Sequence, residues 1–225
     1  MPTDYGMFYK FIRGALRLSS KRPTIQVLPE NVASPVVYVS HHQNMYGPVN
    51  VLKWYPEFVR PWIFSAFMDY QTCYDHYVAY TLTKRLGLST RVAKIVAVPL
   101  AWFMSTLTQS AQGIPVYRQS REVIQTMRQS VEALENGTSL LVFPDVDYSD
   151  NSTVVKEIHA GFLYVEKYYY RKTRKHLPFV PIVAIKNTHE IRTGEPIYFS
   201  GEGSFFEQRK TAAIEIQQSL NALSK

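Results

Sequence analysis

Four short apolar runs, separated by stretches of helical character, constrain the fold more than any other feature of the sequence. The runs are 35–40 (PVVYVS), 62–67 (WIFSAF), 139–143 (SLLVF) and 179–185 (FVPIVAI). Each has the length and the β-branched or aromatic content of a buried strand. Their alternation with helical stretches predicts an α/β fold in which a mostly parallel central sheet is flanked by helices.

The helical stretches are identified by their apolar periodicity. The clearest covers 121–135, where a single apolar stripe ends at Asn136-Gly137, a typical helix stop. Helices are also expected over 161–174 and 206–223. Because the chain has 225 residues and shows no repeat or long linker, we expect one domain over 1–225.

Residues 1–22 predict a basic amphipathic helix. Apolar side chains recur at helical spacing from 5 to 16. Five cations accompany them: Lys10, Arg13, Arg17, Lys21 and Arg22. At ~1 kcal/mol per basic side chain, they would supply a few kcal/mol of attraction to an anionic membrane. The same pattern fits a helix that packs on its own domain, and both interpretations stay open.

Charge and composition narrow the class of partner. The chain carries 25 basic and 18 acidic residues, a net charge of +7, which favours an anionic partner such as phospholipid, an acidic carrier protein or nucleic acid. A single cysteine, Cys73, excludes an internal disulfide and fits a reducing cytosol. No secretory signal is recognisable at the N-terminus. The apolar run 92–104 is shorter than the ~20 residues that span a bilayer, so we expect it to lie at a membrane surface without crossing.

Polar side chains follow two of the predicted strands directly. The first strand leads into SHHQNMYGP at 40–48, and the third leads into PDVDYSD at 144–150. In open α/β sheets, reactive groups gather beyond the carboxyl ends of the strands. Together with Arg118 of GIPVYR (113–118), these loops are expected to converge on one cleft.

Four blocks, in order, resemble motifs of the glycerol-3-phosphate and lysophosphatidate acyltransferase family. VSHHQNMYGP is similar to the HxxxxD block and aligns His42 with the catalytic histidine. GIPVYR resembles the second block, with Gly113 and Arg118, and FPDV resembles the third, with Asp145. FVPIVAI is similar to the fourth. The resemblance covers about residues 35–200.

The resemblance implies an acyltransferase-like fold and an O-acyltransferase of phospholipid biosynthesis. A fatty acyl group would pass from acyl-CoA or acyl carrier protein to a hydroxyl of a glycerol-phosphate or related lipid. His42 would be the general base, a role that suits the near-neutral pKa of imidazole. Arg118 would bind the acceptor phosphate, with Gly113 and Asp145 as further substrate contacts. No metal or cofactor is implied, and a peripheral position on the cytoplasmic side of a membrane is expected.

The first block departs from the family pattern at one position. Gly47 stands where the family has the aspartate that orients the histidine. In serine hydrolases, disabling the orienting carboxylate costs roughly 10⁴-fold in rate. The candidates to replace it are His41, Asp69, Asp75, Asp145 and Asp147, and the sequence does not rank them.

Other functions fit parts of the sequence. The loss of the motif aspartate suggests a catalytically silent, lipid-binding member of the same fold. Asp145 and Asp147 form a DxD that would hold a divalent ion in some glycosyltransferases, which we regard as a weaker alternative. The run YYYRKTRK (168–175) fits the basic end of a helix better than a nucleic-acid site, so no nucleic-acid partner is expected. The remaining histidines lack zinc-ligand spacing.

Overall fold

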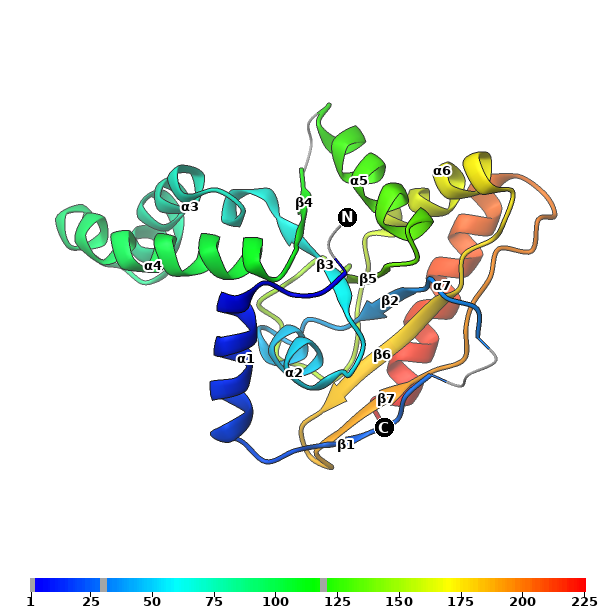
Figure 1. Cartoon of the computed structure of the whole chain (residues 1–225), viewed down its shortest axis with the longest axis horizontal. Coiled ribbons are helices and arrows are strands. Elements are labelled where there is room, and N and C mark those ends of the chain that lie inside the picture. Colours follow the sequence, from blue (N-terminus) through cyan, green and yellow to red (C-terminus); the bar gives the residue numbers. More distant parts are fainter. Residues whose placement is uncertain (1–2, 29–31, 118–120) are drawn as a thin grey trace.

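A central sheet organises the computed structural model, which describes residues 3–28, 32–117 and 121–225. Within these residues, seven strands form a sheet in the order β1-β7-β6-β2-β5-β3-β4 (Figure 1). The strands are β1 (Thr24–Ile25), β2 (Val37–Ser40), β3 (Val59–Phe64), β4 (Ile114–Val116), β5 (Ser139–Val142), β6 (Phe179–Ile185) and β7 (Glu190–Thr193). Strands β6, β2, β5, β3 and β4 are parallel, whereas β7 is antiparallel to β6. The predicted fold class, α/β with a mostly parallel sheet flanked by helices, is confirmed.

Helices cover both faces of the sheet. Helices α5, α6 and α7 lie on one face, and α2 lies on the other with α1 beside it (Figure 1). Helices α3 and α4 pack on each other and project away from the sheet. The helices are α1 (Met7–Leu18), α2 (Tyr46–Trp54), α3 (Tyr70–His76), the π-helix η2 (Tyr77–Arg85), α4 (Thr90–Ser110), α5 (Val123–Glu135), α6 (Tyr164–Thr173) and α7 (Phe205–Leu223), with short 3₁₀ turns η1 (Ser65–Phe67) and η3 (Ala160–Leu163).

The apolar runs are continuous because the central strands are buried on both faces. In β2, Val37 and Val39 pack in the core under α5, α6 and α7, whereas Tyr38 packs on the opposite side with α2. Leu140 and Leu141 of β5 divide in the same way. Alternate side chains of a strand point to opposite faces, so a strand covered on both sides has no polar alternation.

Three of the four predicted strands match the structure, and the remaining one, the second along the chain, is displaced. The run 62–67 was expected to be a strand, but β3 is Val59–Phe64 and the chain turns at η1 directly afterwards. Strand β3 divides its pairing, because 59–61 pairs with β5 and 62–64 pairs with β4. The predicted helix over 121–135 is α5, and Gly137, with a φ of 76°, ends it as expected.

The apolar run 92–104 lies within helix α4, which is longer than the run, and its position at a membrane surface stays a prediction. The helix has 21 residues and is long and apolar enough to cross a membrane, by length and composition alone. It continues through Pro99 and buries a stripe of small residues, Ala93, Ala97 and Ala101, in the protein. The stripe packs on α3 and η2, while the opposite face exposes large apolar side chains.

Candidate active site

The sheet order brings two distant loops together. Strands β2 and β5 are parallel neighbours, so their carboxyl ends lie side by side. His41 and His42 directly follow β2, and Asp145 follows β5 by three residues. The loop carrying Asp145 is held in place because the Pro144 carbonyl accepts from the His159 N–H at 2.7 Å and the Val146 N–H donates to the Glu157 carbonyl at 3.2 Å. The predicted convergence of the histidine and aspartate loops is therefore present.

His41 and Asp145 form a buried pair. The side chain of His41 is 3% exposed and that of Asp145 5%. Nδ1 of His41 hydrogen-bonds Oδ1 of Asp145, and Nε2 of His41 donates to the carbonyl of Ser152 at 3.0 Å. A backbone carbonyl only accepts, and an ionised carboxylate only accepts. Both ring nitrogens therefore act as donors, which makes His41 an imidazolium paired with the Asp145 carboxylate.

The electrostatic surroundings agree with this protonation state. Burial lowers the pKa of His41, but the hydrogen bond and negative charge of Asp145 outweigh burial, and the net pKa is raised above its usual value. The Ser152 carbonyl and the charge of Asp150 act in the same direction. An imidazolium with both nitrogens engaged has no site to take another proton, so His41 is suited to holding the loop rather than to general base catalysis.

His42 contacts the same carboxylate through its backbone. Its N–H donates to Oδ2 of Asp145 at 2.9 Å. Its ring is half-buried and meets Phe143 and Tyr148 edge to face, with ring centroids 5.7 Å and 4.9 Å away. Asp145 thus fixes two consecutive residues, the side chain of His41 and the main chain of His42. Phe143 belongs to the FPDV block, whereas Tyr148 was not singled out from the sequence, and both lie in the loop that carries Asp145.

The turn after His42 explains the glycine at position 47. Gln43 and Asn44 both have left-handed backbone conformations, with φ values of 43° and 58°. This sharp turn brings α2 back onto the loop, where the Gly47 N–H donates to the His42 carbonyl at 3.1 Å. A Cβ atom at Gly47 would collide with the carbonyl oxygen of His41. The backbone here has no room for the side chain that the family motif places at this position.

The other candidate carboxylates have local partners. Asp69 caps α3 by accepting from the Thr72 N–H at 3.0 Å, and Asp75 accepts from Gln71 at 3.2 Å. Asp147 is exposed and accepts from the backbone and hydroxyl of Ser149. Asp145 is the candidate that the structure brings to the histidine loop.

A metal site on the DxD sequence would need Asp145 and Asp147 to act together. Asp145 is buried against His41, whereas Asp147 is exposed in its own turn. Among the described ranges, no group of three histidine, cysteine or acidic side chains is placed to hold a metal ion.

The remaining predicted site residues lie in and after the segment that enters β4. Gly113 is buried, and a Cβ there would lie 2.7 Å from the Ile63 side chain and 3.2 Å from the Thr108 carbonyl. Close packing thus accounts for this glycine, and its role in substrate binding stays a prediction. Arg118 lies outside the described residues.

Comparisons with known proteins identify the fold. No protein-family model matches the chain, and no curated protein matches it either. The crystal structure of the 1-acyl-sn-glycerophosphate (LPA) acyltransferase PlsC from Thermotoga maritima is similar, with a TM-score of 0.55 and 14% sequence identity. The similarity covers 96% of this chain and 78% of that protein. The chain therefore has the α/β fold of the PlsC acyltransferase.

Proposed function

We propose that this protein is an O-acyltransferase. It moves a fatty acyl group from acyl-CoA or acyl carrier protein to a hydroxyl of a glycerol-phosphate or related lipid acceptor. One observation carries the proposal: His42 follows the carboxyl end of β2, with its main chain fixed by Asp145 of the neighbouring strand. This is the sheet edge where α/β folds bind ligands, and the fold is that of an enzyme named for LPA acylation.

In the proposed reaction, the imidazole of His42 takes the proton of the acceptor hydroxyl. Nδ1 of His42 is buried, so Nε2 is the atom assigned to this step. The hydroxyl oxygen then attacks the thioester carbonyl, a new C–O bond forms, and the C–S bond breaks. The departing thiolate takes the proton back from His42. The two co-substrates supply every atom of the products, and no other cofactor enters.

Asp145 acts in this scheme as a positioning residue, in place of the acceptor contact suggested by the motif. Its two carboxylate oxygens bind the His41 ring and the His42 N–H, so it sets the direction in which the loop leaves β2. Arg118 and Gly113 keep their proposed roles at the acceptor.

The proposal includes attachment to the cytoplasmic side of a membrane. Helices α1 and α4 contact each other through Phe8. Its ring packs against Trp102 and Phe103, with ring centroids 5.8 Å and 5.9 Å apart. On α1, Phe11 is 72% exposed, and on α4, Ile95 is 74% exposed. Large exposed apolar side chains on adjoining helices are typical of lipid-contacting surfaces. We propose that this surface enters the membrane interface while the sheet stays outside it.

The test is acyl transfer by the purified protein. Labelled acyl-CoA and acyl carrier protein are each offered with glycerol phosphate, lysophosphatidate and a sugar lipid, and acylated product is measured. We expect transfer by the native chain and near-complete loss in His42→Ala with the fold retained. His159→Ala is the matched control, because His159 has an exposed side chain close to the Asp145 loop. Full activity of His42→Ala would remove His42 as the base.

A second candidate, a catalytically silent lipid-binding protein of the same fold, is favoured by two observations. The motif aspartate is replaced by Gly47, and the nearby Asp145 carboxylate binds the His41 ring. Binding of lysophosphatidate or acyl-CoA without any product, and without an effect of His42→Ala on the affinity, would favour this candidate over the enzyme.

A further inference from the structure

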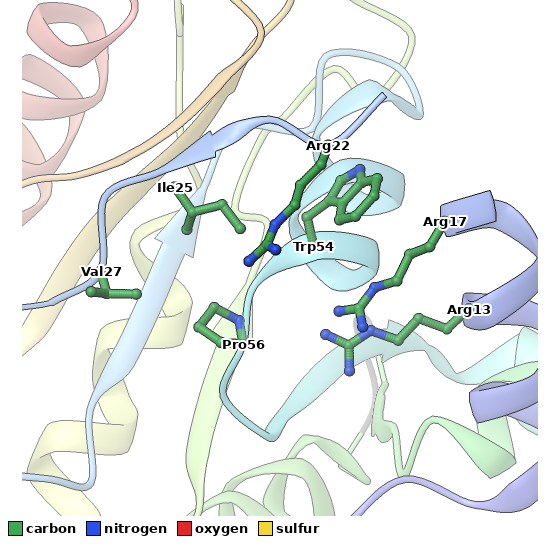
Figure 2. A pocket seen from close by; sticks show the side chains of 7 residues that line it. All are labelled: Arg13, Arg17, Arg22, Ile25, Val27, Trp54 and Pro56. Carbon is green, nitrogen blue, oxygen red and sulfur yellow. The ribbon is translucent and has the colours of Figure 1, made fainter. Parts of the chain in front are cut away.

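A basic cavity lies at the opposite end of the parallel strands from the histidine loop. It has a volume of about 580 Å³ and is lined by Arg13, Arg17, Arg22, Ile25, Val27, Trp54 and Pro56 (Figure 2). Trp54 and Pro56 precede the amino end of β3, whereas His42 follows the carboxyl end of β2, which runs in the same direction. The cavity is therefore separate from the candidate active site.

Two of the arginines are held in place by the end of α2. Nε of Arg13 donates to the Lys53 carbonyl at 2.9 Å, and a terminal nitrogen of Arg13 donates to the Tyr55 carbonyl. Nε of Arg17 donates to the same Lys53 carbonyl at 2.6 Å, and its guanidinium lies 5.6 Å from the Trp54 ring. These bonds cap the negative end of α2. They use two of the five N–H donors of Arg13 and one of Arg17, so further donors are available to a ligand.

The three guanidinium groups converge on one space. Figure 2 shows Arg13 and Arg17 side by side, with Arg22 pointing toward the same space from the β1 side. A fourth cation, Lys53, does not line the cavity but lies next to Trp54, with its Nζ 5.5 Å from the ring. Among the described residues, none of these four cations forms a salt bridge with a carboxylate.

The cations also repel one another. Burial lowers the pKa of Arg17, and the positive charges of Arg13 and Arg22 lower it further. Burial likewise lowers the pKa of Lys53. An anion in the cavity would relieve this repulsion.

We propose that this cavity binds a phosphate ester. Guanidinium groups bind phosphate oxygens in pairs of parallel hydrogen bonds, and three of them match the charge of a phosphomonoester or pyrophosphate. The volume lies within the ~300–1,000 Å³ typical of ligand sites and exceeds what a bare phosphate needs. Ile25, Val27, Trp54 and Pro56 form an apolar wall for the organic part of the ligand. The inference does not depend on acyl transfer.

The phosphate group has two possible sources, a soluble ester or a lipid headgroup, and two assays separate them. Calorimetric titration with pyrophosphate and with glycerol phosphate measures binding from solution. Sedimentation with phosphatidylcholine vesicles, with and without phosphatidate, measures binding at a bilayer. Both assays use the full chain and are repeated at higher salt, which should weaken an ionic contact.

Arg22→Gln is the main variant, because the Arg22 side chain is exposed and its loss leaves the cap of α2 intact. Lys210→Gln on α7 is the matched control, since it removes the same charge from an exposed position elsewhere. We expect Arg22→Gln to weaken binding of the phosphate probe about tenfold, with Lys210→Gln close to native. Arg17→Gln should weaken it further, with a thermal melt as the check on folding.

The outcomes are distinct. Arg22-dependent binding of glycerol phosphate supports a soluble ester, and Arg22-dependent binding of phosphatidate vesicles alone supports a lipid headgroup. Arg22-dependent binding of pyrophosphate alone would overturn the ester, because pyrophosphate has no organic part. Absence of binding in both assays overturns the inference, as does equal weakening by Arg22→Gln and Lys210→Gln. The readout here is the dependence of binding on Arg22, which lies apart from His42, whereas the acyltransferase proposal is tested separately by product formation and its loss in His42→Ala.

Discussion

Replacing Asp145 by asparagine tests the structural core of the candidate site. The substitution keeps the size of the side chain but removes the negative charge that faces the His41 imidazolium. Breaking a buried ion pair by removing one partner typically costs about 3–5 kcal/mol. The amide oxygen can still accept from the His42 N–H, so we expect a loss near the lower end, about 3 kcal/mol in the free energy of unfolding at pH 6.

The loss of stability in Asp145→Asn should depend on pH. Because the pKa of His41 is raised in the folded protein, the stabilisation is fully present below its unfolded pKa of about 6.5 and is lost as pH rises through the folded pKa. The difference between native protein and Asp145→Asn should therefore shrink as the pH rises above about 6.5. His41→Asn should likewise remove the pH-dependent contribution of this pair to the free energy of unfolding.

Urea unfolding, followed by the fluorescence of the three tryptophans, provides the assay. Asp147→Asn is the matched control, because Asp147 is exposed. This substitution should change the free energy of unfolding of the protein by no more than about 0.5 kcal/mol. A loss below about 1 kcal/mol for Asp145→Asn at pH 6, or a loss that grows with pH, would refute the assignment of His41 as a buried imidazolium.

Three further predictions concern separate parts of the molecule. Gly47→Asp introduces the aspartate of the motif that this loop resembles but places a Cβ against the His41 carbonyl, so we expect destabilisation by about 3 kcal/mol or more in urea unfolding and no gain in acyl transfer. Gly113→Ala should cost about 1–3 kcal/mol in the same assay, since its Cβ would lie 2.7 Å from a neighbouring side chain, and an unchanged midpoint would contradict this packing. Phe11→Glu and Ile95→Glu should each reduce sedimentation with anionic vesicles severalfold while leaving the melting temperature nearly unchanged, because both side chains are exposed; native-like binding would argue against this membrane surface.

The strands that are buried on both faces of the sheet were predictable from the sequence. Runs such as 139–143 and 179–185 became β5 and β6 because strands covered on both faces must be apolar throughout. The two-residue β1 and the helix α2 were not predicted. Helix α2 carries a glycine and Pro48 in its first turn, which hides its periodicity, although proline is tolerated at that position.

The candidate site was predictable only in part. The motif pointed to His42 and to the loop containing Asp145, and the structure brings both to one edge of the sheet. Which group contacts Asp145 depended on strand order and on the turn at Gln43, and neither is encoded locally. The basic helix at the N-terminus shows the same limit, since its arginines cap α2, a contact with a segment some forty residues away that periodicity does not reveal.

The double contact of Asp145 has a consequence for protein engineering. The loop 41–47 takes its course from a side chain about a hundred residues later in the chain, so the two segments behave as one exchangeable unit. Residues 41–47 moved alone into another protein of this fold would lose the carboxylate that sets their course. Moving residues 143–159 with them would keep both contacts of Asp145 and hence the path of the histidine loop.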